Sequence, residues 1–196
     1  MKTTAKTVQT MKRCGQWATA LSAIAILFIA GTASAKDNIP FQGTVSAHTI
    51  SLTQNPDGSQ DIRAEEVGVG TLSGQFTALS ATHVAAVDPG QQYDPGTHAL
   101  LIPLTGTGTH TAANGDTWDW TSEGVVIVPL DASFMPLPPP YAYHTTWEVV
   151  GGTGRFAGMT GHGTAEGFSY ADGTDSRIYT GVVSTVGSNR RPSAEL

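Results

Sequence analysis

Cysteine is almost absent from this 196-residue sequence, which contains only Cys14. Residues 36–196 have none. That part of the chain therefore cannot form a disulfide, and it offers neither a thiolate nucleophile nor a cysteine ligand for zinc. Its stability must come from a packed core and from the hydrogen bonds of its backbone.

Charge is scarce as well. Charged residues make up 13% of the sequence, and four of the ten Lys and Arg residues lie within the first 13 positions. The rest of the chain has six basic residues against 16 acidic ones, the opposite of what a nucleic-acid-binding protein needs. Glycine (23) and proline (11) are abundant beside Thr and Ser, and 39% of the residues are hydrophobic. This composition favours a folded, turn-rich β protein over helical bundles or disorder.

The first 35 residues have the three parts of a secretory signal peptide. A basic segment (1–13) precedes an uncharged apolar segment (17–31), and Ala33-Ser34-Ala35 supplies the small residues of a cleavage site. The apolar segment has about 15 residues, short of the roughly 20 that span a bilayer. We therefore predict cleavage near Ala35 and secretion to the periplasm or the medium, with no membrane span in the mature protein.

The remaining residues, 36–196, are predicted to form a single all-β domain. Apolar residues and threonines recur with a period near two over 41–53, 68–87 and 100–113, as in half-buried strands. Turn-forming residues separate these runs, and only 62–67 has the pattern of a helical turn. About eight strands with short connections and no βαβ spacing indicate an eight-stranded antiparallel β-barrel, with a two-sheet sandwich as the alternative.

Two hairpins can be placed on the sequence. Asn114-Gly115 is a preferred pair for a two-residue type I′ turn, and this turn would pair His110 with Asp119 and Thr109 with Trp120. Asp172-Gly173 marks a second such turn, which would pair Phe168 with Arg177 and Glu166 with Tyr179.

These registers supply candidate ligand-binding residues. Large aromatic side chains stabilise most when they are buried, so the rings near the two hairpins are expected to point into the barrel. An eight-stranded barrel has room inside for packed side chains or for one small ligand, and both outcomes stay open. The predicted ligand-binding residues are Trp118, Trp120, Tyr143, Trp147, Phe168, Arg177 and Tyr179.

Four residues are candidates for acid–base chemistry. His110 opposite Asp119, with Glu123 on the same face, would let a carboxylate hold one imidazole tautomer. The alternative is a solvent-facing polar side of the hairpin. Glu166 beside Arg177 and Tyr179 is a second polar group, either a surface salt bridge or a buried carboxylate that needs the guanidinium.

Familiar motifs of other chemistries are missing. The six histidines form no HxH or HExxH pair, and there is no GxSxG, phosphate-binding or calcium-loop pattern, so neither a metal nor a cofactor is expected. The GGTGRFAG run (151–158) is followed by strand-like sequence instead of a helix, which argues against a dinucleotide loop.

Two motifs carry a resemblance to a known group of proteins. The sequence reads VVGGTGRFAGMTGHG over 149–163, and AANGD (112–116) stands upstream. Together they resemble exported bacterial β-barrel proteins of mostly unknown function, over about 68–181. At longer range, the strand and turn at Gly151-Gly152-Thr153-Gly154 are similar to those of the allene oxide cyclase and dirigent barrels. That resemblance implies an eight-stranded barrel holding an apolar, oxidised small molecule, and its catalytic acid maps onto no position here.

The sequence therefore predicts an exported, monomeric or weakly oligomeric β-barrel that binds a small apolar or aromatic molecule. One alternative is a cyclase or isomerase, which requires an ionisable group inside the barrel. Another is a non-catalytic surface or structural protein acting through its outer face.

Overall fold

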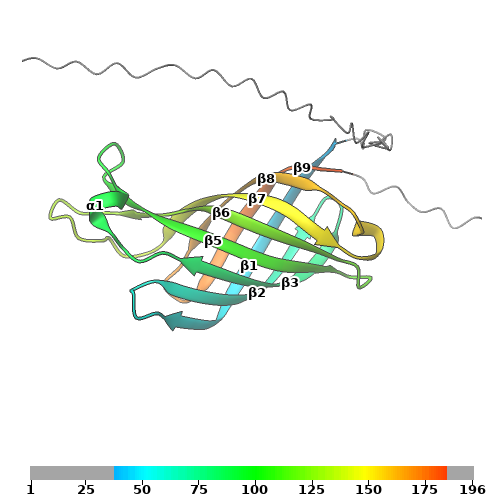
Figure 1. Ribbon diagram of the computed structural model, residues 1–196, viewed down its shortest axis with the longest axis horizontal. Coiled ribbons are helices and arrows are strands. Elements are labelled where there is room, and N and C mark those ends of the chain that lie inside the picture. Colours follow the sequence, from blue (N-terminus) through cyan, green and yellow to red (C-terminus); the bar gives the residue numbers. More distant parts are fainter. Residues whose placement is uncertain (1–37, 185–196) are drawn as a thin grey trace, which may run out of the picture. The chain divides into compact units, whose positions relative to one another are not determined.

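The computed structural model describes residues 38–184 of the chain, and nearly all of its regular structure is β-strand (Figure 1). The predicted signal peptide at 1–35 lies outside the described residues. The elements are β1 (Asn38–Gln54), β2 (Gln60–Gly70), β3 (Gly74–Val84), α1 (Pro89–Gln92), β4 (Tyr93–Asp94), β5 (Ala99–Ala112), β6 (Thr117–Pro129), β7 (Tyr141–Gly152), η1 (Gly154–Phe156), β8 (Gly161–Ser169) and β9 (Thr174–Ser184).

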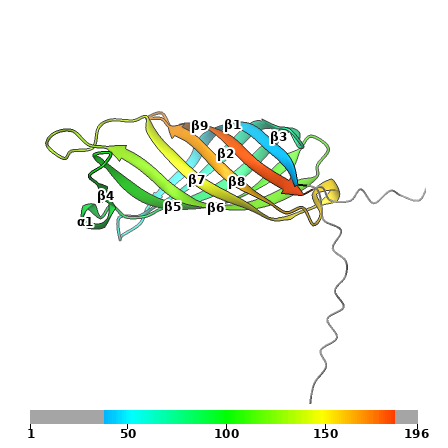
Figure 2. The same cartoon turned by 90° about the horizontal axis from the view of Figure 1, so that it is seen from above.

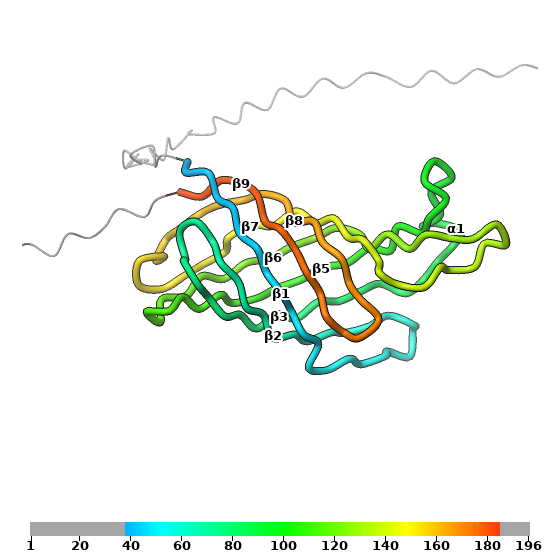
Figure 3. Tube along the Cα trace, turned by 180° about the vertical axis from the view of Figure 1, so that it is seen from behind, coloured from blue at the N-terminus to red at the C-terminus, as the bar shows by residue number. Residues whose placement is uncertain are grey.

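The strands form a closed barrel. Each strand pairs antiparallel with its neighbours in the order β3-β2-β1-β9-β8-β7-β6-β5, and a further pairing of β3 with β5 joins the two edges. β1 and β9, the first and last strands, lie side by side (Figures 2 and 3). Within the part of the chain that the structure describes, the two-residue β4 pairs only with β5. The predicted eight-stranded antiparallel barrel is thus confirmed, and the two-sheet sandwich is excluded.

Alternation along each strand decides which side chains fill the barrel. On β1, for example, Phe41, Val45 and Ala47 are buried while Gln42, Thr44 and Ser46 are exposed. The segment 62–67, interpreted from sequence as a helical turn, belongs to β2 because it pairs with both β1 and β3.

Large rings inside the barrel lie over glycines of neighbouring strands. A Cβ added to Gly108 would stand 2.6 Å from Cζ2 of Trp120, and one added to Gly163 or Gly181 would stand 2.7 Å from Cζ2 of Trp147. The missing side chains therefore make the space that the indoles occupy, which explains why the strands tolerate so much glycine.

The two ends of the barrel differ. At one end the turn after β7 forms η1, where Gly154 has a φ of +54° and the buried Phe156 and Met159 join the aromatic core. At the other end α1 and the loop 131–140 extend from the strands (Figure 1). There a separate apolar cluster of Leu100, Ile102, Val128 and Leu130 packs between the ends of β5 and β6.

Both predicted hairpin registers are wrong by one residue. His110 pairs with Trp118, and Phe168 pairs with Ser176. Each turn is a three-residue loop closed by a backbone hydrogen bond, from Ala112 N to Asp116 O and from Tyr170 N to Thr174 O. The closing glycines, Gly115 and Gly173, have φ of +86° and +80°. One positive-φ residue per turn is the signature of the three-residue loop with a glycine bulge, whereas a type I′ turn needs two.

Candidate functional site

A cavity of about 120 Å3 lies inside the barrel, toward the end opposite η1. Alanine, leucine and valine side chains and the ring of Trp120 form part of its wall. The polar part of the wall includes Ser80, Ser122, Tyr143, Thr145, Asp175, Arg177 and Tyr179. A protein cavity of about 150 Å3 is known to admit benzene, so this one suits a molecule of about one ring.

Arg177 is the centre of a hydrogen-bonded cluster on the cavity wall. The alternation of β9 places Asp175, Arg177 and Tyr179 on its inner face. Nε of Arg177 donates to Oδ1 of Asp175 at 2.9 Å, and Nη1 donates to the hydroxyl oxygen of Tyr179 at 3.2 Å. The hydroxyl of Tyr143, from β7, donates to the same Asp175 oxygen at 2.8 Å. Four polar side chains from two strands thus hold one another in place.

Behind this cluster lies a second carboxylate with less complete pairing. Oε1 of Glu66 is 3.2 Å from Nη1 of Arg177, and Oε2 is 3.8 Å from Nε2 of His110. The His110 ring lies among the rings of Phe76 and Trp118, with centroids 4.3 and 4.2 Å away. Within residues 38–184, neither the Glu66 oxygens nor the His110 nitrogens have a hydrogen-bond partner. The attraction between the Glu66 carboxylate and the Arg177 guanidinium, more than hydrogen bonding, therefore holds Glu66 in place.

Burial and charge set the protonation of the inner pair. Burial alone would raise the pKa of Glu66, but His110 and the Arg177 guanidinium hold it below its ordinary value. Burial lowers the pKa of His110, and Arg177 lowers it further against the opposing effect of Glu66. At neutral pH the group thus contains an ionised Glu66, a neutral His110 and a charged Arg177.

The titratable groups that face the cavity have raised pKa values, in contrast to the lowered pKa values of Glu66 and His110. Burial raises the pKa of Asp175 despite the opposing effects of Arg177 and Tyr143. Burial also raises the pKa of Tyr143, and that of Tyr179 to about 12. Both phenols therefore keep their protons at neutral pH and serve as hydroxyl donors and acceptors.

The structure separates the predicted ligand-binding residues into three groups. Trp120, Tyr143, Arg177 and Tyr179 line the cavity. Trp118 and Trp147 are buried as predicted but pack with Phe41 in the core. Phe168 was expected inside, and this was wrong, because the one-residue register difference puts it on the outer wall, 49% exposed.

The predicted acid–base residues do not form the expected groups. Glu166 lies on the outer wall, where its side chain is 75% exposed and 3.4 Å from His144. Glu123 is exposed, and Asp119 faces outward and accepts a hydrogen bond from Thr109 at 2.6 Å. His110 does point inward, but Asp119 is on the opposite face, so the predicted pair was wrong and the carboxylate near His110 is Glu66.

Sequence reasoning missed Glu66 and Asp175. On β2, Glu66 shares the inner face with small residues, whereas the larger apolar residues, the valines, are exposed. The hydrophobic pattern of this strand therefore predicts the wrong face as the inner one. Asp175 had a usable signal, because it shares the two-residue period with Arg177 and Tyr179.

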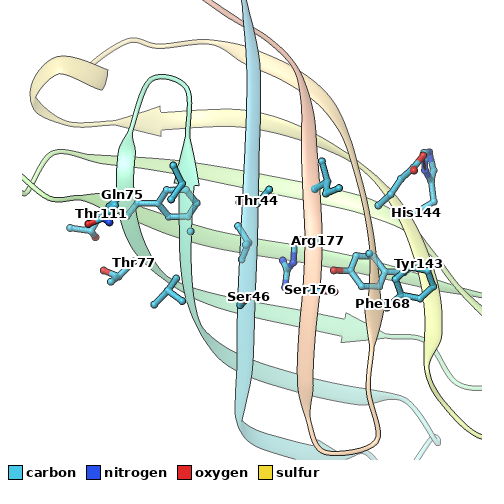
Figure 4. A pocket seen from close by; sticks show the side chains of 18 of the residues that line it. Thr44, Ser46, Gln75, Thr77, Thr111, Tyr143, His144, Phe168, Ser176 and Arg177 are labelled. Atoms are coloured by element: carbon cyan, nitrogen blue, oxygen red, sulfur yellow. Dashed lines mark ion pairs between the residues drawn. The ribbon is translucent and has the colours of Figure 1, made fainter.

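A larger open hollow, of about 1220 Å3, lies on the outer wall across β1, β9, β8 and neighbouring strands (Figure 4). Its exposed apolar side chains include Val67, Val69, Phe168 and Ile178. Glu166 and His144 lie next to each other on its outer face, 3.4 Å apart. Tyr143 and Arg177 line this hollow as well as the inner cavity.

The buried imidazole predicts a pH dependence of stability. Below a pH of about 6.5, the ordinary pKa of histidine, the unfolded chain takes up a proton that folded His110 does not. We therefore expect the free energy of unfolding to fall as the pH is lowered from 6.5 to 5, by at most about 1.4 kcal/mol per pH unit for one proton. Urea denaturation followed by tryptophan fluorescence at several pH values measures this slope.

The matched control is His110→Phe, which keeps a ring among the same aromatic neighbours and cannot titrate. Its slope between pH 6.5 and 5 should be smaller than that of the unchanged chain. A slope equal in both proteins would contradict the assignment of this pH dependence to His110.

Within residues 38–184, no helix has the length and apolar character to cross a membrane, and no group of three or more His, Cys, Asp or Glu side chains is placed to hold a metal ion. Comparisons with protein-family models, with curated proteins and with solved structures give no match for this chain.

Proposed function

We propose that this protein binds a small molecule in the cavity at the end of its barrel opposite η1. The observation that carries the proposal is the cavity of about 120 Å3 itself, whose wall includes the ring of Trp120 and the hydrogen-bonded side chains of Asp175, Arg177 and Tyr179.

The shape of the interior supports a ligand more than a fully packed core. The aromatic core fills the η1 end of the barrel, whereas the other end keeps a space of about 120 Å3. Concave sites with a mostly apolar wall and a few converging polar groups are typical of small-molecule binding. Trp120, Tyr143 and Tyr179 offer ring surfaces for an apolar or aromatic body, and the Arg177 cluster offers fixed polar contacts.

A cavity-filling variant tests this proposal. Ala64 is buried on β2 and lines the cavity, so Ala64→Leu should fill part of it and weaken binding at least about tenfold. Ala81→Leu is the matched control, because Ala81 is exposed on the adjacent strand. The measurement is the Trp120 indole resonance in 15N-labelled protein, titrated with single-ring compounds. The proposal fails if no compound moves that resonance, or if both variants bind like the unchanged chain.

A second candidate function is acid–base catalysis on the bound molecule, as in a cyclase or isomerase. Asp175 favours it, because this carboxyl lines the cavity, has a raised pKa and is positioned by Tyr143 and Arg177. We expect such an enzyme to exchange the α hydrogens of bound cyclohexanone for deuterium faster than buffer does, with the excess lost in Asp175→Asn. Exchange at the rate of buffer alone would leave binding as the function.

Export is a separate part of the proposal and is supported by the sequence of residues 1–35. The amino-terminal sequence of protein recovered from outside the cytoplasm should begin at Lys36. The likeness to exported bacterial barrels and to the allene oxide cyclase and dirigent barrels stays a prediction from two motifs.

A further inference from the structure

We infer that the cavity selects a small organic cation, a molecule of about one ring whose ammonium group binds Oδ2 of Asp175. This inference rests on the proposed function and adds the chemical class of the ligand. It depends on which oxygen of Asp175 is already paired and on the balance of charge around the cavity.

One oxygen of Asp175 is paired and the other is available to a ligand. Oδ1 accepts hydrogen bonds from the hydroxyl of Tyr143 at 2.8 Å and from Nε of Arg177 at 2.9 Å. Oδ2 has no hydrogen-bond partner among residues 38–184, and the described side-chain atoms that are both unpaired and shut off from solvent lie on other residues. Asp175 lines the inner cavity and not the outer hollow. The accessible surface of Oδ2 therefore faces the cavity.

The charges around the cavity do not balance. Arg177 is one cation near two carboxylates, with Asp175 Oδ1 at 2.9 Å and Glu66 Oε1 at 3.2 Å. His110, the other basic side chain of the cluster, is neutral because burial lowers its pKa. With both carboxylates ionised, the cluster carries one net negative charge. A ligand with one positive charge would balance it, whereas a carboxylate ligand would add a third negative group.

The ligand and Asp175 would favour each other's charged form. Burial raises the pKa of Asp175, which means that the ionised carboxyl is costly in the empty cavity. A cation beside Oδ2 stabilises that ionised form. The carboxylate is already held by Tyr143 and Arg177, so binding does not have to order it.

The loops at the cavity end of the barrel have the same sign of charge. These loops cover 55–59, 85–98, 130–140 and 170–173, and they contain no lysine or arginine. They contain five aspartates, namely Asp57, Asp88, Asp94, Asp131 and Asp172. At the η1 end, by contrast, Asp116 lies 3.7 Å from Arg155. An acidic rim attracts cations toward the cavity and repels anions.

Size and the wall narrow the class further. A space of about 120 Å3 suits about one six-membered ring. The rings of Trp120, Tyr143 and Tyr179 offer surfaces for the apolar body, and aromatic faces also attract cations. An ammonium group has three N–H donors and no acceptor, which suits a wall that offers a carboxylate oxygen and several hydroxyl oxygens.

The test uses two compounds of nearly the same shape, cyclohexylammonium and cyclohexanol, which differ in charge. Their dissociation constants are measured by NMR titration at pH 7.5, where an alkylammonium keeps its proton. The proteins are the unchanged chain, Asp175→Asn, whose amide oxygen can still accept from Tyr143 and Arg177, and the control Glu166→Gln. Glu166 is 75% exposed on the outer wall, so the control removes the same charge away from the cavity.

Because the two compounds differ in hydration, the informative quantity is the change in the ratio of their dissociation constants between proteins. We expect Asp175→Asn to shift this ratio against cyclohexylammonium by about tenfold, and Glu166→Gln to leave it unchanged. An equal shift in both variants would show an effect of overall charge and would overturn Oδ2 of Asp175 as the binding atom.

A second measurement does not depend on any variant folding. In the unchanged chain, cyclohexylammonium should bind at least about tenfold more tightly than cyclohexanol, and cyclohexanecarboxylate should bind most weakly. The Trp120 ring lines the cavity, so its indole resonance should move with the compounds that bind.

The outcomes separate the two proposals. If cyclohexanol or cyclohexanecarboxylate binds the unchanged chain as tightly as cyclohexylammonium, or if the ratio is the same in Asp175→Asn, the cavity binds ligands and the inference about their class is overturned. If none of the three compounds binds the unchanged chain, the inference fails together with the proposed function.

Discussion

Replacing Arg177 with methionine is expected to lower the free energy of unfolding by about 3–5 kcal/mol. The arginine is the cation between Glu66, whose side chain is fully buried, and Asp175, whose side chain is 19% exposed. Methionine fills similar space but leaves both carboxyl groups without a positive partner. The free-energy cost of an unpaired buried charge exceeds what the packing of the methionine side chain contributes. Urea denaturation at pH 7.5, followed by tryptophan fluorescence, measures the change.

Two further variants show whether the loss comes from charge. Arg63→Met removes an arginine from the exposed face of β2 and should change stability by no more than about 0.5 kcal/mol. The double variant Glu66→Gln with Arg177→Met should recover part of the loss, because it removes one of the two unpaired charges. If the double variant is as unstable as the sum of the two single variants, Glu66 and Arg177 are not coupled and the cluster described here is wrong.

The fold follows from local signals in the sequence, whereas the register between strands does not. Period-two patterns identified the strands and their antiparallel connection, because alternation reflects the inside and outside of one sheet. The hairpins at Gly115 and Gly173 were each placed one residue off. Asn-Gly and Asp-Gly suit both a two-residue turn and the last two positions of a three-residue loop, and the choice depends on whether the first residue of the pair takes a positive φ.

That single residue explains most of the error in the predicted site. A shift by one in an antiparallel pair exchanges the side chains that share a face across the two strands. With the correct register, His110 is inside next to Trp118, and Arg177 is inside opposite Gly167, while Glu166 and Phe168 are outside. The inward direction of Trp120 and Tyr143 does not depend on the hairpin register. It follows from alternation within each strand and from the free energy gained when a large ring is buried.

The charged interior was less predictable for a different reason. Hydrophobic patterning assumes that the larger apolar residues of a strand face the core. On β2 the valines at 67 and 69 face solvent, and Glu66 faces the barrel interior with small residues on either side. The interior needs small residues there because rings from other strands fill the space, as the closeness of Phe76 to Gly68 shows. Because the fit of side-chain volumes depends on the neighbouring strands, the sequence of β2 alone does not predict which of its faces points inward.

The same argument about faces leads to a second large effect. Trp147→Ala is expected to lower the free energy of unfolding by about 3–5 kcal/mol. Its ring is 2% exposed, lies 5.5 Å from Phe41 and 6.4 Å from Trp118 between centroids, and covers the glycines at 163 and 181. Removing the ring leaves a space, and the glycines beneath it have no side chains that could fill this space. Chemical denaturation monitored by circular dichroism measures the loss without depending on tryptophan fluorescence.

Phe168→Ala is the matched control, since it removes another aromatic ring from a strand next to β7. Phe168 is on the outer wall, so the change should be no more than about 0.5 kcal/mol. Had the two-residue turn at Asp172-Gly173 been correct, this ring would face the interior and its loss would cost several kcal/mol. Comparable losses in the two variants would therefore contradict the register of β8 against β9, and with it the placement of Arg177 in the cavity wall. A large loss of unfolding free energy in Trp147→Ala but not in Phe168→Ala would support both the β8–β9 register and the placement of Arg177. The register decides which of these side chains lie inside the barrel.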